Sequence, residues 1–413
     1  MIILFCYKAD HMQKILHLIP SLKFGGEERF LLDIYPFLDK KFEHIICPFL
    51  HAGQWYHQDL NLDHYKNNRF WLSVFQSEKL GVTILKPYLL FFYYTHRARK
   101  IIQKEKPTIV ISYTVQAAIA TYVSHFFSRK KNFFWYARVG NQMDHPALLQ
   151  KIFRTKWTYR YSKMLINSVL KKVFSTADSI IAVNSFLIQK TAATYKLSTE
   201  KFFFLPCCLP PENNGLQDHS YKLIDGDFLI TIGRLEYQKG FDFLINTFVN
   251  FSRAYPTIKL LIVGDGSQRK ELAQLIKHHQ LTEKVFLPGF IAHPERLISK
   301  ALFCLIPSRT EGFCKVVIEA MAERSIVIAS NCDFGPREII QDNINGILFE
   351  NECGKSLLRA MKNVMEMSEE SKNHLKKGAY QRSLEYTPQH ITSMLNIHLT
   401  KTAQNIIHHP LSL

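Results

Sequence analysis

The sequence predicts an α/β protein of two doubly wound domains, each a parallel sheet with helices on both faces. Three observations support this prediction. A chain of 413 residues is long for one hydrophobic core, so two domains of about 200 residues are expected. Short runs that are apolar throughout alternate with helical patterns, which is typical of parallel strands buried on both faces. A proline-rich and then polar stretch at 205–215 interrupts this alternation and indicates a linker.

The first expected domain covers residues 1–205 and opens with a strand, a glycine loop and a helix. The apolar run at 14–19 is followed by Gly25-Gly26 and then by a helical pattern at 27–35. Because residues 1–11 precede this strand, we expect Met12 to begin the functional fold. The further elements are a basic helical stretch at 88–104 and apolar runs at 108–113, 133–139 and 179–183.

The second expected domain, residues 206–385, repeats the same alternation. We expect residues 386–413 to form a C-terminal helix that packs back on the first domain. The strands expected in the second domain are 228–232, 259–263, 285–287, 302–306 and 327–329. The helices expected there are 239–254, 268–278, 294–300, 314–323 and 335–341.

Composition excludes several classes of protein. Hydrophobic residues make up 47% and charged residues 21%, a globular balance that excludes disordered, collagen-like and coiled-coil chains. No run approaches the roughly 18–20 apolar residues of a membrane-spanning helix. Residues 1–8 lack the basic region and the long apolar stretch of a signal peptide. The eight cysteines form no C-x-x-C pair, so reduced thiols and a cytoplasmic location are expected.

The positive charge is concentrated in the first half of the chain. Segment 91–172 contains sixteen lysine and arginine residues against two acids (Glu105 and Asp144), a net charge of +14, and is rich in Phe, Tyr and Trp. A solvated basic face is one interpretation, and a nucleic-acid surface is another. Because no nucleic-acid-binding motif accompanies the charge, we favour attachment to an anionic membrane surface and expect no nucleic-acid partner.

Two segments of the second half indicate a phosphate and sugar site at strand ends. Arg234 and Lys239 flank a short loop after the strand at 228–232, where their side chains can clamp a diphosphate. In the second segment, Glu311 lies in a loop before a helix and Glu319 lies about two turns into that helix. The helix N-terminus can receive phosphate, Glu319 can accept ribose hydroxyls, and Glu311 can reach an attached sugar. A helix-capping carboxylate and a structural salt bridge are the alternative.

Other chemistries have weaker support. The glycine turn at 263–267 lacks the G-x-G-x-x-G fingerprint of dinucleotide sites, and no P-loop motif is present. Asp225-Gly-Asp227 is formally a D-x-D metal-binding motif, but it precedes a strand, which favours a solvated turn. No metal and no cofactor are expected, because cationic side chains and a helix N-terminus can neutralise a diphosphate.

Together these motifs resemble glycosyltransferase family 4, the retaining transferases of GT-B fold that use nucleotide sugars. The resemblance rests on Gly233-Arg-Leu with Lys239-Gly240, on Val-Gly-Asp-Gly-Ser at 263–267, and on Glu311-Gly-Phe with Glu319. Asn-Gly-Ile-Leu-Phe at 345–349 and the segment at 17–29 also match, whereas Arg337 stands where many members have proline. The resemblance implies two Rossmann-like domains that face each other across a cleft, with the acceptor side in the first and the donor site in the second.

The resemblance also implies roles for individual residues. Arg234 and Lys239 would hold the donor diphosphate, Glu311 the sugar hydroxyls, and Arg138, at a strand end, would approach the transferred sugar. The remaining residues expected to bind the donor are Gly25, Gly26, Gly233, Gly312, Phe313 and Glu319.

The function expected is retaining transfer of a hexose or N-acetylhexosamine from a nucleotide diphosphate sugar to a glycan or lipid-linked acceptor. UDP is preferred to GDP on family frequency, and the process would be cell-surface polysaccharide or lipopolysaccharide synthesis at the inner face of the cytoplasmic membrane. Two alternatives stay open: a nucleotide-sugar hydrolase or phosphorylase of the same fold, and a basic nucleic-acid or lipid-binding protein on a degenerate transferase. Nucleotide release from a nucleotide sugar, and its dependence on an acceptor, would separate these functions.

Overall fold

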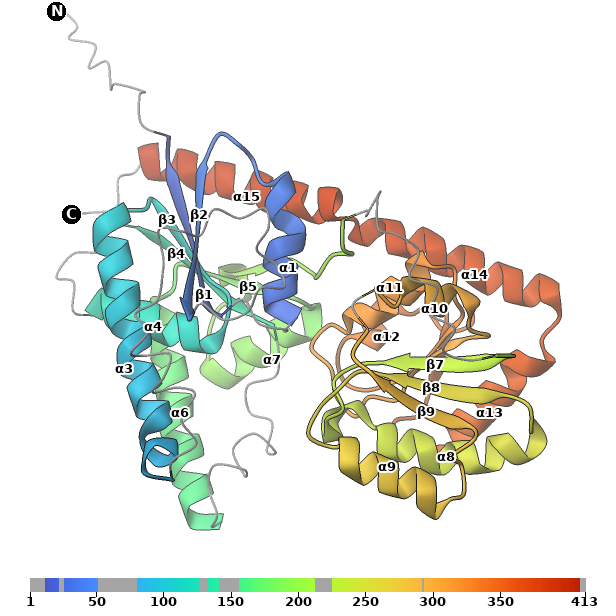
Figure 1. The fold of residues 1–413 in the computed structure, drawn as a ribbon. Helices are drawn as coiled ribbons and strands as arrows, with labels where there is room; N and C mark the ends of the chain where they lie inside the picture. The colour runs from blue at the N-terminus through green and yellow to red at the C-terminus, as the bar shows by residue number, and fades with distance from the viewer. Residues whose placement is uncertain are drawn as a thin grey trace, which may run out of the picture. The chain divides into compact units, whose positions relative to one another are not determined.

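The computed structural model describes residues 12–21, 26–50, 80–126, 133–140, 156–211, 225–291 and 293–408 (Figure 1). The chain divides into two compact units. Unit 1 comprises residues 1–205 and 392–413, and unit 2 comprises residues 206–391.

Unit 1 is built on a six-stranded sheet with the order β2-β1-β3-β4-β5-β6. Every neighbouring pair of strands is parallel. The chain therefore reverses its direction of sheet growth between β1 and β3, which makes this the topological switch point of the unit. The strands are β1 (Lys14–Ser21), β2 (Glu43–Leu50), β3 (Ile109–Ser112), β4 (Phe134–Val139), β5 (Ser179–Ala182) and β6 (Phe202–Phe204).

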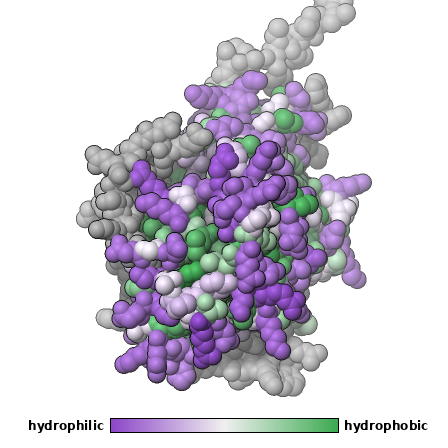
Figure 2. Space-filling view, turned by 90° about the vertical axis from the view of Figure 1, so that its right-hand side faces the viewer, coloured by the Kyte–Doolittle hydropathy of each residue, from purple (hydrophilic) through white to green (hydrophobic). Residues whose placement is uncertain are grey.

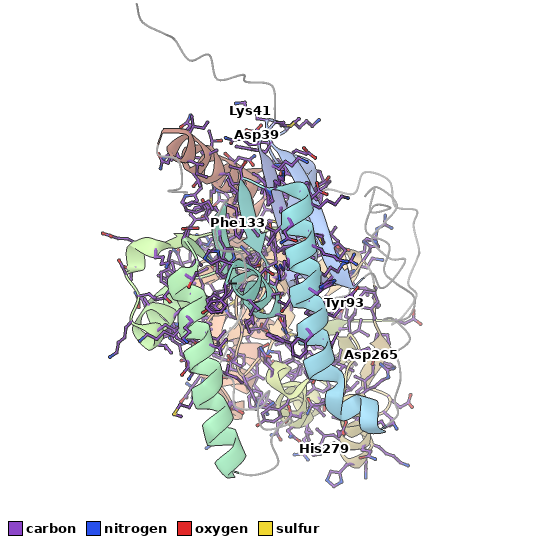
Figure 3. All side chains as sticks on the ribbon, turned by 90° about the vertical axis from the view of Figure 1, so that its left-hand side faces the viewer. Asp39, Lys41, Tyr93, Phe133, Asp265 and His279 are labelled. Atoms are coloured by element: carbon purple, nitrogen blue, oxygen red, sulfur yellow. The ribbon has the colours of Figure 1, made fainter. Side chains whose placement is uncertain are left out.

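Helices cover both faces of this sheet (Figure 1). Side chains alternate along β4, so Tyr136 and Arg138 point to one face, where Tyr136 contacts α15 and Arg138 contacts α1. On the other face, α4 lies between α3 and α6. Figure 3 shows Tyr93 on α3 and places Asp39 and Lys41 at the end of unit 1 where β2 begins. The helices are α1 (Gly26–Ile34), α3 (Leu80–Glu105), α4 (Val115–Phe126), α6 (Lys156–Thr176), α7 (Ser185–Tyr195) and α15 (Pro388–His408).

Unit 2 is built on a second six-stranded parallel sheet, with the order β12-β11-β10-β7-β8-β9. Its switch point lies between β7 and β10, because β8 continues the sheet on one side and β10 on the other. The strands are β7 (Phe228–Ile232), β8 (Lys259–Val263), β9 (Val285–Gly289), β10 (Cys304–Ile306), β11 (Val327–Ser330) and β12 (Ile347–Phe349).

Helices also cover both faces of the second sheet. Helices α8, α9 and α13 lie on one face, and α10, α11, α12 and α14 lie on the other (Figure 1). The core between the sheet and its helices is aromatic and aliphatic, with Phe241, Phe248, Phe251 and Phe303 fully buried. The helices are α8 (Phe241–Ala254), α9 (Arg269–His278), α10 (Glu295–Lys300), α11 (Lys315–Ala322), α12 (Pro336–Ile339), α13 (Gly354–Glu366) and α14 (Glu369–Ser383).

The predicted fold class is confirmed: both units are parallel-sheet α/β domains of Rossmann type. The expected strands form within two residues of their predicted limits, whereas β2, β6 and β12 were not predicted. Strand β2 begins with two polar residues and contains Pro48, and β6 and β12 have only three residues each. The helix expected at 335–341 is shorter than predicted and ends at Ile339, because Ile340 is extended.

The surface of the described residues is mainly polar. In Figure 2, hydrophilic residues cover most of the visible face, and hydrophobic residues form small groups between them. No helix in the described part of the chain has the length and apolar character needed to cross a membrane. Of the cysteines described, six are buried and Cys353 is half-buried, and all of them are free thiols.

Candidate functional site

The switch point of unit 2 brings two predicted motifs together. The loop after β7 contains Arg234 and Lys239, and the loop after β10 contains Glu311. Because β7 and β10 are neighbouring parallel strands, both loops leave the same edge of the sheet. In doubly wound domains this edge is where ligands bind.

Glycines allow these loops to pack with backbone against backbone. A Cβ atom added to Gly264 would lie 1.9 Å from the carbonyl oxygen of Gly233, and one added to Gly266 would lie 2.6 Å from that of Leu235. Gly240 has a φ of 67°, and its Cβ would lie 2.1 Å from the carbonyl oxygen of Pro307. Any larger residue at Gly240 would therefore separate the two loops at the switch point.

Lys239 and Glu311 form the closest charged contact at this edge. Nζ of Lys239 donates to Oε1 of Glu311 at 2.5 Å, and Oγ of Ser308 donates to the same oxygen at 2.7 Å. Only 18% of the Lys239 side chain and 7% of the Glu311 side chain are exposed. Among the described residues, none donates to Oε2 of Glu311, so this oxygen is available to a ligand hydroxyl.

The electrostatics of the pair keep Lys239 charged. Burial acts to lower the pKa of Lys239, but the adjacent Glu311 carboxylate outweighs it and raises this pKa above its ordinary value. The charge of Arg234 opposes the rise, which indicates that the two cations are near each other. Burial, and then Glu311, raise the pKa of Cys314 well above its ordinary value, so this thiol stays protonated.

Arg234 has a different environment from Lys239. Its side chain is exposed and, among the described residues, has no hydrogen-bond or ion-pair partner. Lys239 is thus pre-positioned by Glu311, whereas Arg234 is free to move toward an anion. The arrangement offers a phosphate one fixed cation and one adjustable cation.

The start of α11 lies beside this pair. Cys314 precedes the helix with a φ of 69° and makes no side-chain capping bond. Gly312 and Phe313 are buried in the loop, and a Cβ on Gly335 would meet the carbonyl oxygen of Phe313 at 2.7 Å. The amino-terminal turn of α11 is therefore held close to Glu311 and can contribute backbone N–H groups to an anion.

Glu319 lies within α11 and is half-buried rather than enclosed in apolar side chains as expected. Its neighbours Ile318 and Ala320 are buried. The pKa of Cys304, on β10, is raised to about 12, first by burial and second by the negative charge of Glu319. Glu319 therefore lies near the sheet, about two turns along the helix from Glu311.

In unit 1, Arg138 is the predicted site residue with the most contacts. Its guanidinium is buried, its Nε donates to Glu27 at 2.6 Å, and one Nη donates to the carbonyl oxygen of Leu205 at 3.2 Å. The group also lies 3.8 Å above the ring of Phe30. Gly26, the first residue of α1, is exposed, whereas Gly25 lies outside the described residues. Arg138 thus occurs at a strand end as predicted, but it is paired with a carboxylate.

A buried polar chain at the switch point of unit 1 was not predicted. Nδ1 of His17 lies 2.9 Å from the Tyr113 hydroxyl, and Nε2 of His17 lies 2.9 Å from Nδ1 of His44. Nε2 of His44 lies 3.2 Å from the carbonyl oxygen of Asp39. Because that carbonyl can only accept, neutral His44 donates from Nε2, His17 donates to His44, and Tyr113 donates to His17. With both histidines neutral, each of the three contacts has one donor and one acceptor, whereas protonation of both would bring two N–H donors face to face between His17 and His44.

Sequence reasoning missed the residues that complete these pairs. Ser308 donates to Glu311, Arg309 of the same loop pairs with Asp242, and Glu27 pairs with Arg138. Glu27 immediately follows the glycine loop in the sequence, which is the one local signal that it lies at the same sheet edge. Asp225 and Asp227 are exposed in the turn before β7, away from the strand ends that carry the other motifs.

Comparison with solved structures supports the fold. The structure is similar to the lipopolysaccharide outer core galactosyltransferase WaaB, with a TM-score of 0.66 and 16% identity over 94% of this chain and all of that one. It is also similar to Anabaena HepE in complex with UDP and glucose, with a TM-score of 0.68 and 18% identity over 95% of this chain and all of that one. At these identities, the likeness concerns the GT-B fold.

Two curated relatives match part of the chain. An N-acetylgalactosaminyltransferase of Campylobacter jejuni, whose named acceptor is a diphospho-undecaprenol-linked saccharide, is 27% identical over 55% of this chain and 65% of its own length. The amylovoran biosynthesis glycosyltransferase AmsD of Erwinia amylovora is 33% identical over 41% of this chain and 46% of its own length. The chain therefore spans less than two thirds of either relative. Residues 220–382, which make up most of unit 2 and contain Lys239, Glu311 and Glu319, match the family described as glycosyl transferases group 1.

Proposed function

We propose that this protein is a retaining glycosyltransferase of family 4 that transfers a hexose or N-acetylhexosamine from a UDP-sugar to a glycan or lipid-linked acceptor, with UDP as the leaving group. The observation that carries the proposal is the Lys239–Glu311 pair at the switch point of unit 2, inside the segment that matches the group 1 family. Among the relatives, a transferase that acts on a diphospho-undecaprenol-linked saccharide and a glycosyltransferase of amylovoran biosynthesis support this acceptor class. The UDP complexes of HepE support the choice of nucleotide.

In this mechanism the bond between the anomeric carbon and the donor phosphate oxygen breaks, and the acceptor hydroxyl oxygen bonds to the same face of the sugar. The acceptor proton passes to the departing phosphate oxygen. Lys239, Arg234 and the first turn of α11 stabilise the negative charge that develops on the diphosphate. Because Lys239 is already held by Glu311, little reorganisation accompanies the reaction.

Glu311 and Glu319 have separate tasks in this proposal. Oε1 of Glu311 holds Lys239, and Oε2, which has no donor among the described residues, accepts a hydroxyl of the transferred sugar. Glu319 accepts the ribose hydroxyls. In unit 1, Arg138 is paired with Glu27, and its role at the transferred sugar stays a prediction.

We further propose that transfer needs no metal ion. Two cationic side chains and a helix N-terminus supply the charge that a metal would otherwise bring to the diphosphate. Activity should therefore persist in EDTA, and strict dependence on a divalent cation would contradict this part of the proposal.

The function is tested by incubating the full chain with UDP-glucose, UDP-galactose and their N-acetyl derivatives, with and without a membrane extract as acceptor source. Release of UDP that depends on the acceptor supports a transferase, whereas release without an acceptor supports a hydrolase. Proton NMR of the product, in which the α and β anomers differ, then reports whether configuration is retained. Absence of nucleotide release with every donor would reject the proposal.

We also propose that unit 1 attaches to the anionic inner face of the cytoplasmic membrane. The amino-terminal ends of α3 and α6 project from the same end of unit 1 (Figures 1 and 3). Along these two helices, Phe92 and Met164 are 68% and 63% exposed. Arg99, Lys100 and Lys104 continue along the exposed side of α3. Apolar groups beside basic groups suit insertion at an anionic surface, to which each cation contributes about 1 kcal/mol.

Sedimentation with vesicles tests this attachment. The protein should bind phosphatidylglycerol vesicles, bind neutral vesicles weakly, and be released by added salt, because the attraction is screened over about 8 Å at physiological ionic strength. Phe92→Ser should weaken binding, whereas Phe126→Ser, at the end of a different helix (α4), should not. Binding that ignores lipid charge, or a preference for duplex DNA, would reject the membrane proposal.

A further inference from the structure

Arg309 lies at the centre of a network that joins the two loops of the unit 2 switch point. Its two Nη atoms donate to the two carboxylate oxygens of Asp242, at 2.8 and 2.9 Å. One Nη also donates to the carbonyl oxygen of Tyr237 at 2.7 Å, and Nε donates to Glu352 at 2.7 Å. The guanidinium lies 3.9 Å above the ring of Tyr237. One side chain of the loop after β10 thus holds both the second half of the loop after β7, at Tyr237, and the first turn of α8, at Asp242.

The backbone repeats this connection between the same loops. The N–H of Arg309 donates to the carbonyl oxygen of Gln238 at 2.8 Å, and the Gln238 side chain donates to the carbonyl oxygen of Thr310 at 2.8 Å. Asn351 donates to the carbonyl oxygen of Arg309 at 3.1 Å. Both sequence neighbours of Lys239, Gln238 and Gly240, thus contact the 307–310 segment. Glu311 directly follows that segment, so these contacts bring Lys239 and Glu311 together.

The guanidinium of Arg309 is largely occupied by these contacts. A guanidinium has five N–H donors, and Arg309 uses four of them on two carboxylates and one carbonyl while stacking on an aromatic ring. The bidentate pair with Asp242 is the geometry in which arginine–carboxylate bonds are strongest. Arg309 is thus occupied by protein groups, whereas Arg234, in the same edge of the sheet, is exposed and without a partner among the described residues.

We propose that Arg309 is a positioning residue of the donor site: it sets the register of the 237–242 and 307–311 loops and so holds Lys239 against Glu311. It contacts no donor itself. The inference rests on the function proposed above for its effect on nucleotide binding. Its effect on the Lys239–Glu311 contact can be measured without any nucleotide.

The first experiment measures that contact in the full chain without ligand. Only neutral amines react with an acetylating ester, so Lys239, which is largely buried and paired with Glu311, should be labelled slowly. Mass spectrometry then gives the labelling rate of each lysine, with exposed Lys270 as an internal reference. Arg309→Met should raise the rate at Lys239 about tenfold or more, the effect of one pKa unit on the neutral fraction. An unchanged rate at Lys239 would overturn the inference.

The second experiment measures UDP affinity by calorimetry. Arg309→Met should weaken UDP binding about tenfold, and Arg309→Lys should not rescue it, because lysine cannot make the bidentate and stacked contacts. In a Lys239→Met background, Arg309→Met should have little further effect, since it acts through Lys239. Equal loss in both backgrounds would mean a general structural role and would overturn the inference.

Arg324→Met is the matched control, because Arg324 also lies 3.8 Å above a tyrosine ring but at the far end of α11. It should change neither the Lys239 labelling rate nor UDP affinity. Should Arg309→Met fail to fold, Asp242→Asn removes the charged partner with little change of shape and takes its place. If the wild-type protein binds no UDP, the proposed function fails, and the labelling experiment still decides the role of Arg309.

Discussion

Unit 1 should lose stability as the pH falls, because the buried His17–His44 pair resists protonation. Burial, with the charge of His44 as a second cause, holds the pKa of His17 well below its ordinary value. Burial also lowers the pKa of His44, although the hydrogen bond and the charge of Asp39 oppose this. In the unfolded chain both pKa values return to about 6.5. Below about pH 6.5 the unfolded chain therefore binds more protons than the folded one, and stability falls toward the folded-state pKa values.

The size of the effect follows from the proton balance. A histidine that stays neutral in the folded state lowers the free energy of unfolding by about 1.4 kcal/mol for each pH unit well below its unfolded-state pKa. Between about pH 7 and about pH 5.5, His17 alone should therefore lower the free energy of unfolding by about 1.3 kcal/mol. His44 contributes less, since Asp39 partly offsets its burial. A loss of this size is a substantial part of the stability of a domain.

Tryptophan fluorescence can follow unit 1 alone during urea unfolding of the full chain, because all four tryptophans (55, 71, 135 and 157) belong to unit 1. His17→Gln should lower the free energy of unfolding at every pH, since Tyr113 and His44 lose a partner, but it should reduce the pH dependence by about 1.3 kcal/mol over the same range. His96→Gln, at an exposed position of α3, is the control and should leave the pH dependence intact. The same pH dependence in His17→Gln as in the wild type would refute the reasoning.

Three further predictions concern unit 2. Gly240→Ala should destabilise unit 2 by about 1–3 kcal/mol and weaken UDP binding, because φ is 67° and the Pro307 carbonyl leaves no room for a Cβ; circular dichroism and calorimetry would measure both. Arg234→Ala should weaken UDP binding by about 1.5–3 kcal/mol without changing the thermal midpoint, and unchanged affinity would remove it from the donor site. Glu319→Gln should reduce affinity for free UDP, whereas Glu311→Gln should mainly reduce turnover, and equal losses of UDP affinity would contradict the separate roles.

The sequence was sufficient for the fold class because the central strands are apolar throughout and are separated by helical patterns. Ile109–Ser112 and Val327–Ser330 are buried along their whole length, as is typical of strands in a parallel sheet covered on both faces. Strand β2 could not be predicted in this way, because Glu43 and His44 at its start face ion-pair and hydrogen-bond partners from other strands and loops. Its pairing with β1 is a tertiary effect.

The motifs predicted which residues of the candidate site lie at one sheet edge, but not how those residues contact one another. Strand ends and glycine loops placed Lys239 and Glu311 at one sheet edge, but Lys239 and Arg234 were expected only as two cations that clamp a diphosphate, with no difference in environment between them. Their difference depends on the register between two loops that are 72 positions apart in the sequence. That register is set by Arg309 and by the space that Gly240 leaves for Pro307, and neither residue carries a local signal of such a role.

The pairing of Lys239 with Glu311 also explains how a buried lysine can serve a diphosphate site. A lysine with this little exposure would lose its charge to burial if it were alone, and a neutral amine would attract no phosphate. Glu311 keeps it protonated and holds it in place. Because only Oε1 accepts from Lys239 and Ser308, the remaining oxygen can face a sugar hydroxyl while the ammonium keeps hydrogens for a phosphate. The same contact can thus prepare the cation for the diphosphate and orient the sugar beside it.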